Sequence, residues 1–205
     1  MRGSSDIRIA ASALFCYASL LISGCSGGAP TAATGTPEWT IQSASIAAKN
    51  RDADRYISFF SDERHRSELV GELSLLTIQV PIRELAESEG AHSVKEVDAL
   101  LADEIALLTA LGKDWAWLSK TSKLGDDEES QELENAVAKV ANPGELWAKS
   151  LKKHPGMMIW WGSKIENVQV NGETATAKAY AEGNPNFDHQ LKLKRINGEW
   201  KIDVR

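Results

Sequence analysis

Cysteine is scarce in this sequence, which contains only Cys16 and Cys25, and none follows position 25. The rest of the chain therefore offers no disulfide framework, no thiolate metal site and no cysteine nucleophile. Histidine is scarce as well: four occur singly, at positions 65, 92, 154 and 189, without the spacing of metal ligands or of a catalytic triad. We expect no catalytic residues of these kinds, no metal and no cofactor.

The chain also lacks an excess of positive charge. It contains 23 lysines and arginines against 29 aspartates and glutamates, which gives a formal net charge of −6. No block of consecutive basic residues occurs. Nucleic-acid-binding domains usually carry a basic patch that neutralises phosphates. The composition therefore argues against a nucleic acid as partner.

Long apolar runs are rare too, and one uncharged run covers residues 9–22. It is shorter than the ~20 apolar residues that a membrane-spanning helix needs, and it follows Arg2 and Arg8, as in a signal peptide. The small residues Ser23 and Gly24 come next, immediately before Cys25. Small side chains suit a peptidase cut before Cys25, so we expect residues 1–24 to be a removable signal segment.

The run Ile22, Ser23, Gly24 and Cys25 resembles the lipobox of bacterial lipoproteins. This resemblance implies that Cys25 becomes the mature N-terminus and carries acyl chains such as palmitate. The membrane is then a partner, through the lipid on Cys25, and the protein is exported to the periplasmic or extracellular face of the cell membrane or outer membrane. An ordinary secretory signal with a coincidental cysteine is the alternative.

Residues 25–37 are rich in Gly, Ala, Thr, Ser and Pro, and their composition predicts a flexible tether. Residues 38–205 are long enough for one domain, which is helical to about position 154 and strand-like from position 157. Helices followed by strands indicate an α+β fold. Apolar periodicity, together with capping residues such as Ser93 with Glu96, predicts six helices. They cover residues 38–49, about 54–60, 62 to 81 or beyond, 94–111, 132–140 and 145–153. The acidic run 126–129 is expected to be a solvated loop that passes into the N-terminus of a helix.

The C-terminal part predicts an antiparallel meander of about four strands. Apolar and polar residues alternate there, and the pairs at 171–172 and 197–198 are Asn-Gly, a strong hairpin signal. A loop is expected over residues 183–186. We expect the strands to form one sheet with Leu191, Leu193, Trp200 and Ile202 on its buried face.

The end of the meander, residues 198–202 with the sequence Gly-Glu-Trp-Lys-Ile, resembles the nuclear-transport-factor-2-like (SnoaL-like) superfamily. The opening at 37–40, the stretch 50–54 and the Phe-Phe-Ser-Asp stretch at 59–62 are similar to that group as well. The resemblance implies a curved sheet that wraps a long helix into a cone. Residues from about 81 to 156 are a longer, more helical insert than this group usually has, which leaves open whether the cone is empty or filled. Tyr180 and Asp203 match no catalytic motif of the superfamily.

Tryptophan is the one residue type that points to a binding site. Trp160 and Trp161 are adjacent, so on a strand one side chain faces inward and the other outward. The outward tryptophan, with its neighbour and Tyr180, is the candidate site for a small apolar ligand or a protein partner. The histidines are expected at the surface, and His189 and Asp188 should point to opposite faces of a strand.

Three functions are compatible with these observations. The first is a non-enzymatic, lipid-anchored binding or interaction domain of the cell envelope, which we favour. The second is an enzyme of the nuclear-transport-factor-2-like type, which requires a buried Asp, Tyr or His set in an open cavity. The third is a structural accessory subunit of an envelope complex, which requires an exposed apolar patch on the insert at 81–156.

Overall fold

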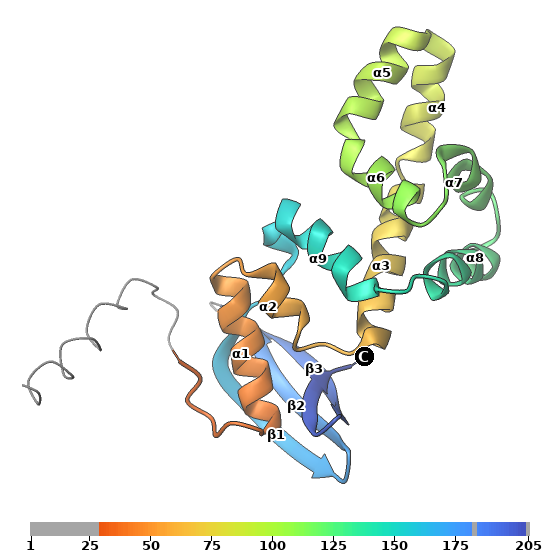
Figure 1. Cartoon of the computed structure of the whole chain (residues 1–205). Coiled ribbons are helices and arrows are strands. Elements are labelled where there is room, and N and C mark those ends of the chain that lie inside the picture. The colour runs from red at the N-terminus through yellow and green to blue at the C-terminus, as the bar shows by residue number, and fades with distance from the viewer. Residues whose placement is uncertain (1–28, 182–183, 204–205) are drawn as a thin grey trace, which may run out of the picture.

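The computed structural model describes residues 29–181 and 184–203, and in it helices precede a curled antiparallel sheet (Figure 1). The α+β fold expected from the sequence is therefore confirmed. The predicted signal segment, Cys25 and the first part of the tether lie outside the described residues. Residues 31 and 32, which belong to the predicted tether, donate backbone hydrogen bonds to the Gln42 side chain at 2.8 and 3.0 Å. The last part of the tether is thus attached to the first helix.

The first two helices begin at residues that cap them with a side-chain oxygen. Helix α1 (Pro37–Lys49) starts after Thr36, whose hydroxyl accepts from the Trp39 N–H, and α2 (Ala53–Ile57) starts after Asp52, which accepts from the Arg55 N–H. Helix α1 packs on the concave face of the sheet (Figure 1). Small buried side chains on both surfaces allow this close approach; they are Ala44, Ala47 and Ala48 on the helix and Ala175, Ala177 and Ala179 on the sheet.

The sheet has the strand order β1-β2-β3-β4, with each strand antiparallel to the next. The strands are β1 (Trp161–Asn171), β2 (Thr174–Ala181), β3 (Asn184–Ile196) and β4 (Glu199–Ile202). Leu191, Leu193, Trp200 and Ile202 are buried, as predicted. Two register shifts in β1, one of them at Asn167 with a φ of 53°, interrupt the pairing and are of the kind that curls a sheet.

Strand β3 begins earlier than the sequence predicted, because the described part of the expected loop at 183–186 belongs to the strand. After a register shift beside Tyr180, Ala181 pairs with Asn184, so the ladder continues into residues with strong turn preferences. Pairing to β2 outweighs local preference here. A further contact closes the core, where the Ser61 N–H donates to the Ile202 carbonyl at 2.9 Å and the Ile202 N–H donates to the Phe59 carbonyl at 2.8 Å.

The remaining helices lie between α2 and the sheet in sequence, and α4 and α5 lie farthest from the sheet in space (Figure 1). They are α3 (Asp62–Thr77), α4 (Val80–Glu89), α5 (Ala91–Leu100), α6 (Ala102–Ala110), α7 (Trp115–Thr121), α8 (Asp126–Ala138) and α9 (Pro143–Lys153), followed by the short 3₁₀ turn η1 (Pro155–Met157). Helix α9 returns across α3 towards the sheet and carries the buried Trp147 into the core.

Several predicted helix boundaries were wrong. The helix expected at 94–111 is broken at Leu101 into α5 and α6, and α5 buries none of its residues, so its apolar periodicity has no core to match. Ser93 lies inside α5 and does not cap it. Helix α7 was not predicted. The acidic run at 126–129 lies at a helix N-terminus as predicted, but it forms the first turn of α8 instead of a loop before it, and its carboxylates stand near the unpaired N–H groups of the helix start.

Candidate functional site

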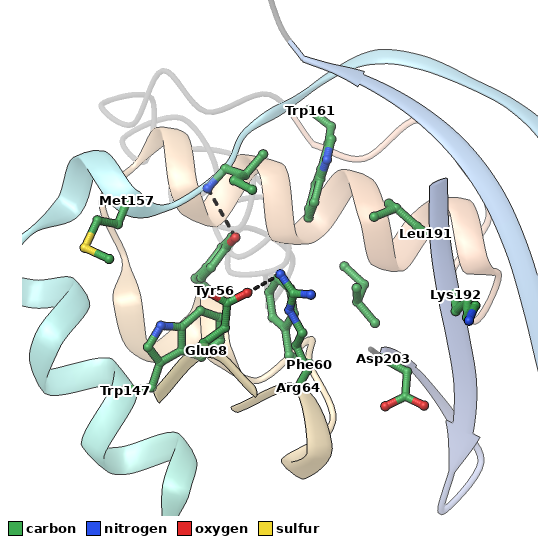
Figure 2. A pocket seen from close by; sticks show the side chains of 12 residues that line it. Tyr56, Phe60, Arg64, Glu68, Trp147, Met157, Trp161, Leu191, Lys192 and Asp203 are labelled. Atoms are coloured by element: carbon green, nitrogen blue, oxygen red, sulfur yellow. Dashed lines mark hydrogen bonds and ion pairs between the residues drawn. The ribbon is translucent and has the colours of Figure 1, made fainter. Parts of the chain in front are cut away.

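The interior of the curled sheet is filled by aromatic side chains (Figure 2). Phe60 packs at ring distances of 4.7 Å from Tyr56, 5.4 Å from Trp147 and 6.4 Å from Trp161. The cavity left between these rings, Leu191 and Ile202 measures about 30 Å³, which is roughly the volume of one water molecule. Three elements supply the filling: α9, β1 and the segment from α2 to the start of α3.

Polar groups around this small cavity are engaged in the fold. The Tyr56 hydroxyl accepts from the Ile159 N–H at 3.2 Å, Arg64 forms an ion pair with Glu68, and the Ser61 hydroxyl bonds to Asp203. Figure 2 shows the ion pair and the tyrosine contact at the edge of the cavity. A cavity of this size has no room for a substrate beside these groups, so the interior is built for packing.

The three aromatic residues singled out from the sequence do not come together. Trp161 is buried in the core, whereas Trp160 is 43 % exposed with the Lys49 ammonium 5.3 Å from its ring centre. One tryptophan therefore faces inward and the other outward, as predicted. Tyr180 lies on the opposite face of β2 from the buried alanines, and its hydroxyl donates to Glu166 at 2.8 Å. Each of the three has different surroundings.

The expectation that the histidines lie at the surface was wrong for two of them. His65 and His189 are buried, because they lie on the core faces of α3 and β3, whereas His92 and His154 are exposed. The His65 Nε2 atom lies 3.0 Å from the Ile57 carbonyl oxygen. Asp188 is exposed and pairs with Lys178 at 2.7 Å, so it points away from the buried His189, as predicted.

A much larger cavity, of about 790 Å³, lies between α3, α6 and α9. We call it the α3/α6/α9 groove. Helix α3 contributes Glu72, Leu75 and Leu76, and Gln79 follows at the start of α4; α6 with the residue before it contributes Leu101, Asp103, Glu104, Ala106, Leu107 and Ala110. The third wall, α9 and η1, contributes Leu146, Lys149, Ser150, Lys152, Lys153, His154 and Met157. Its volume falls within the range of about 300–1,000 Å³ usual for small-molecule sites.

The groove arises because each helix lends it one face. The lining residues 72, 75 and 76 of α3, 103, 106, 107 and 110 of α6, and 146, 149, 150 and 153 of α9 all follow the spacing of neighbours on one side of a helix. Two of the four on α6 are alanines, whose short side chains leave space that leucine would fill. The core face of α3, where His65, Leu69, Leu73 and Leu76 are buried, adjoins the groove face, and Leu76 belongs to both.

Glu72 is a carboxyl group in the wall of this groove, and the sequence reasoning missed it. Its pKa is raised from the ordinary 4.5 to about 7, mainly because burial disfavours the charged form; a hydrogen bond with Ser150 lowers the pKa, and the nearby carboxylates Glu68 and Glu104 raise it. The Glu72 Oε1 atom is buried and has no hydrogen-bond partner among the described residues. The signal in the sequence that could have identified Glu72 is its spacing of three, four and seven residues from Leu75, Leu76 and Gln79, which is typical of one face of a helix.

The basic residues around the groove are paired with acids. Lys149 bonds to Glu145 at 3.0 Å, Lys152 to Asp54 at 2.7 Å, and Lys153 to Asp103. The exposed His154 stands at the end of α9. No ion pair to Glu72 or to Glu104 occurs within the described ranges 29–181 and 184–203. The groove is therefore an apolar trough whose uncompensated charge is negative.

An apolar stripe continues from the groove along the outside of α4. Leu75, Ile78, Ile82 and Leu85 recur every three or four residues and are between 53 and 65 % exposed. We call Leu75, Ile78, Ile82 and Leu85 the α3–α4 stripe. Leu100 on α5, outside the stripe, is 82 % exposed. Solvent-exposed leucine and isoleucine at helical spacing indicate a surface that contacts something else.

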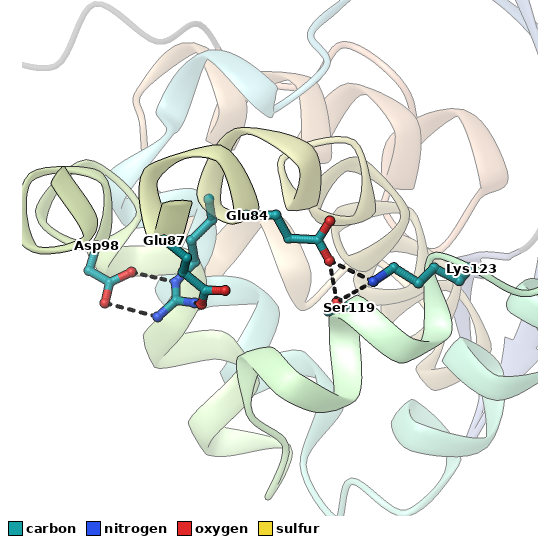
Figure 3. Close-up of polar contacts among 6 residues, drawn as sticks. Glu84, Glu87, Asp98, Ser119 and Lys123 are labelled. Carbon is teal, nitrogen blue, oxygen red and sulfur yellow. Dashed lines mark hydrogen bonds and ion pairs between the residues drawn. The ribbon is translucent and has the colours of Figure 1, made fainter. Parts of the chain in front are cut away.

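Polar contacts hold the helices that carry this stripe (Figure 3). Arg83 of α4 donates to Asp98 of α5 at 2.7 Å and also pairs with Glu87. Glu84 accepts hydrogen bonds from the Ser119 hydroxyl of α7 and from the Lys123 ammonium just after that helix, each at 2.7 Å, and these bonds lower its pKa. Ion pairs and hydrogen bonds thus help to hold α4 and α5, because these helices bury few apolar side chains.

Within residues 29–181 and 184–203, no group of three or more His, Cys, Asp or Glu side chains is placed to hold a metal ion, and no helix is both long and apolar enough to cross a membrane. Comparison with protein-family models, with curated protein sequences and with solved structures gave no match. The function must therefore be inferred from the geometry of the domain itself.

Proposed function

We propose that this protein is a lipid-anchored binding domain of the cell envelope, and that its binding site is the α3/α6/α9 groove. The observation that carries the proposal is the groove itself, whose cavity of about 790 Å³ is lined by leucine, alanine and methionine side chains together with a similar number of polar and charged residues. Sites with these properties typically bind small, largely apolar molecules. The lipobox resemblance at Cys25 supports the envelope location and the anchor.

The geometry favours this function over an enzyme of the nuclear-transport-factor-2-like type. Such an enzyme holds its catalytic groups in the cone, and here aromatic rings reduce the cone to about 30 Å³. The ionisable groups nearest to that space, Arg64, Glu68 and Asp203, are occupied with structural partners. The open site is elsewhere, on the helical insert and α3.

The proposal predicts that a bulky residue in the groove abolishes ligand binding. We would titrate the full chain carrying Cys25→Ala, so that no acyl chain of its own competes, with the neutral apolar dye Nile red. Ala106→Trp fills the groove from an exposed position, where it should not disturb the core. Ala102→Trp is the matched control, because Ala102 is exposed on the same helix but does not line the groove.

We expect saturable binding of Nile red to the parent protein and to Ala102→Trp, and loss of at least tenfold in affinity for Ala106→Trp. Equal affinities in all three proteins would mean that the dye binds elsewhere, and the groove would then not be the binding site. The parent and both variants should unfold at similar urea concentrations, which separates loss of the site from loss of the fold.

A second candidate, the structural accessory subunit, is favoured by the α3–α4 stripe. Its four exposed apolar side chains lie partly within the helical insert, where that hypothesis requires them. A photo-reactive amino acid at Ile82 should then give one discrete crosslinked protein in intact cells, whereas the same group at the exposed Glu89 should give none. Identical patterns at both positions would count against a specific partner on the stripe.

A further inference from the structure

We infer that the α3/α6/α9 groove takes an amphiphile with a positively charged amino head group, held by Glu72 and Glu104, and an apolar tail that lies on the leucine side chains of the groove. This inference rests on the proposed function and adds the chemical class of the ligand. Its basis is that the carboxyl groups of Glu72 and Glu104 have no counterion among the described residues.

The carboxylates of the groove are not equivalent. Asp103 is neutralised by Lys153, and Glu68, just beyond the groove, is neutralised by Arg64. Glu72 and Glu104 are coupled to each other by repulsion, and neither forms an ion pair with any described residue. Two carboxylates that share a partly buried site favour the arrival of a cation between them.

The geometry also explains why a cation with an apolar tail fits better than a simple metal ion. Glu72 and Glu104 both line the groove, and the buried Oε1 atom of Glu72 lacks a hydrogen-bond donor among the described residues. An ammonium group in the groove supplies several donors to these two carboxyl groups, while its hydrocarbon chain lies along Leu75, Leu107 and Leu146. Charge-assisted hydrogen bonds of this kind are stronger than neutral ones.

The lysines around the groove do not favour a ligand with an anionic head group. Lys149, Lys152 and Lys153 each have an acidic partner, so an anionic head group would have to compete with a carboxylate already in place. It would also meet the negative charge of Glu104. The groove therefore discriminates by charge in favour of amines, and a fatty acid should bind less tightly than the matching amine.

The test compares three probes that differ in the head group only: dodecylamine, dodecanol and dodecanoate, each below the concentration at which it forms micelles. Each displaces Nile red from the full chain carrying Cys25→Ala at pH 7.5. We expect dodecylamine to bind about tenfold more tightly than dodecanol, and dodecanoate to bind most weakly. In Glu72→Gln and Glu104→Gln the preference for the amine over the alcohol should fall to about threefold or less.

Glu134→Gln is the matched control, because Glu134 is exposed on α8, does not line the groove, and its change alters the net charge equally. It should keep the preference for the amine. A second readout follows from the carboxyl group itself: because the Glu72 pKa is about 7, an ammonium group that binds beside it should expel up to about half a proton at pH 7. Calorimetry in phosphate and in Tris buffer measures that release.

The outcomes separate the two proposals. If Nile red and dodecanol bind in the groove but dodecylamine is not preferred, or if its preference survives both glutamate substitutions, the inference is overturned and the proposed function stands. A preference for dodecanoate would overturn it as well, in favour of an anionic ligand. If no probe shows binding that Ala106→Trp removes, the groove is not a ligand site and both proposals fail.

Discussion

The half-buried Glu72 makes a specific prediction about how the stability of this protein depends on pH. Replacing it by glutamine keeps the shape and the hydrogen-bonding capacity of the side chain but removes the ionisation. In the folded protein the pKa of Glu72 is about 7, whereas the unfolded chain has the ordinary value of 4.5. Between these two pH values the folded state holds a proton that the unfolded state has lost.

The sign of the effect follows from this difference. Because the native state binds the extra proton, the contribution of Glu72 to the free energy of unfolding is fully present below pH 4.5 and is lost as the pH rises through about 7. The Glu72→Gln variant has no such loss. Its stability relative to the parent protein should therefore increase from pH 5 to pH 7 and remain constant from about pH 7.5 upward.

The magnitude can be worked out from the same difference. A pKa change from 4.5 to about 7 corresponds to about 3 kcal/mol for a group that solvent does not reach. The Glu72 side chain is only partly buried, and solvent screens its charge, so we expect a relative gain of about 1–2 kcal/mol for the variant. This exceeds the usual error of a urea unfolding experiment.

The assay is urea unfolding of the parent protein and of Glu72→Gln at pH 5, 6, 7 and 8. Glu84→Gln is an informative control, since hydrogen bonds from Lys123 and Ser119 lower the Glu84 pKa. Its contribution is lost only below the ordinary pKa of 4.5, so from pH 5 to pH 8 this variant should be less stable than the parent protein by a constant amount. A stability difference between Glu72→Gln and the parent that does not change from pH 5 to 8 would refute the reasoning.

Three further predictions concern the core, one close contact and the anchor. Trp200→Ala should lower the free energy of unfolding by about 3–5 kcal/mol, because Trp200 is buried in the sheet; a loss below about 1 kcal/mol in urea unfolding would contradict this. Gly144→Ala should cost about 1–3 kcal/mol in the same experiment, because a Cβ atom there lies 2.9 Å from the buried His65 ring, whereas Gly156→Ala meets no atom within 4 Å and should be neutral. Cys25→Ala should abolish labelling by a radioactive fatty acid and release the protein from the membrane fraction; retained label would disprove acylation at this residue.

Much of the fold could be predicted because its signals are local. Alternating apolar residues and Asn-Gly turns predicted the meander and the buried face of Leu191, Leu193, Trp200 and Ile202, since side chains of a strand alternate strictly between its two faces. The helix start at position 62 was predicted as well, and there the Ser61 hydroxyl accepts from the backbone N–H of Arg64, a contact only three residues long. The α+β order follows from these local patterns alone.

The elements that were predicted wrongly depend on distant contacts. Apolar periodicity predicted one helix over 94–111, but periodicity shows only which face would pack and not whether anything packs there; the structure breaks this helix at Leu101 and leaves α5 without a buried side chain. His65 and His189 look alike in sequence to the exposed His92 and His154, and only the position of the core relative to α3 and β3 buries the first two.

The candidate site was decided by tertiary structure. In the sequence Glu72 is one acid among many on a helix, and Ala106, Leu107, Leu146 and Ser150 belong to segments far apart in the chain. The groove exists because three helices meet with short side chains on one of them, and the pKa of Glu72 rises because burial and two other carboxylates converge there. Local sequence determines the periodicity of each helix, whereas cavity volume and desolvation are properties of several helices together, so they appear only when the chain is folded.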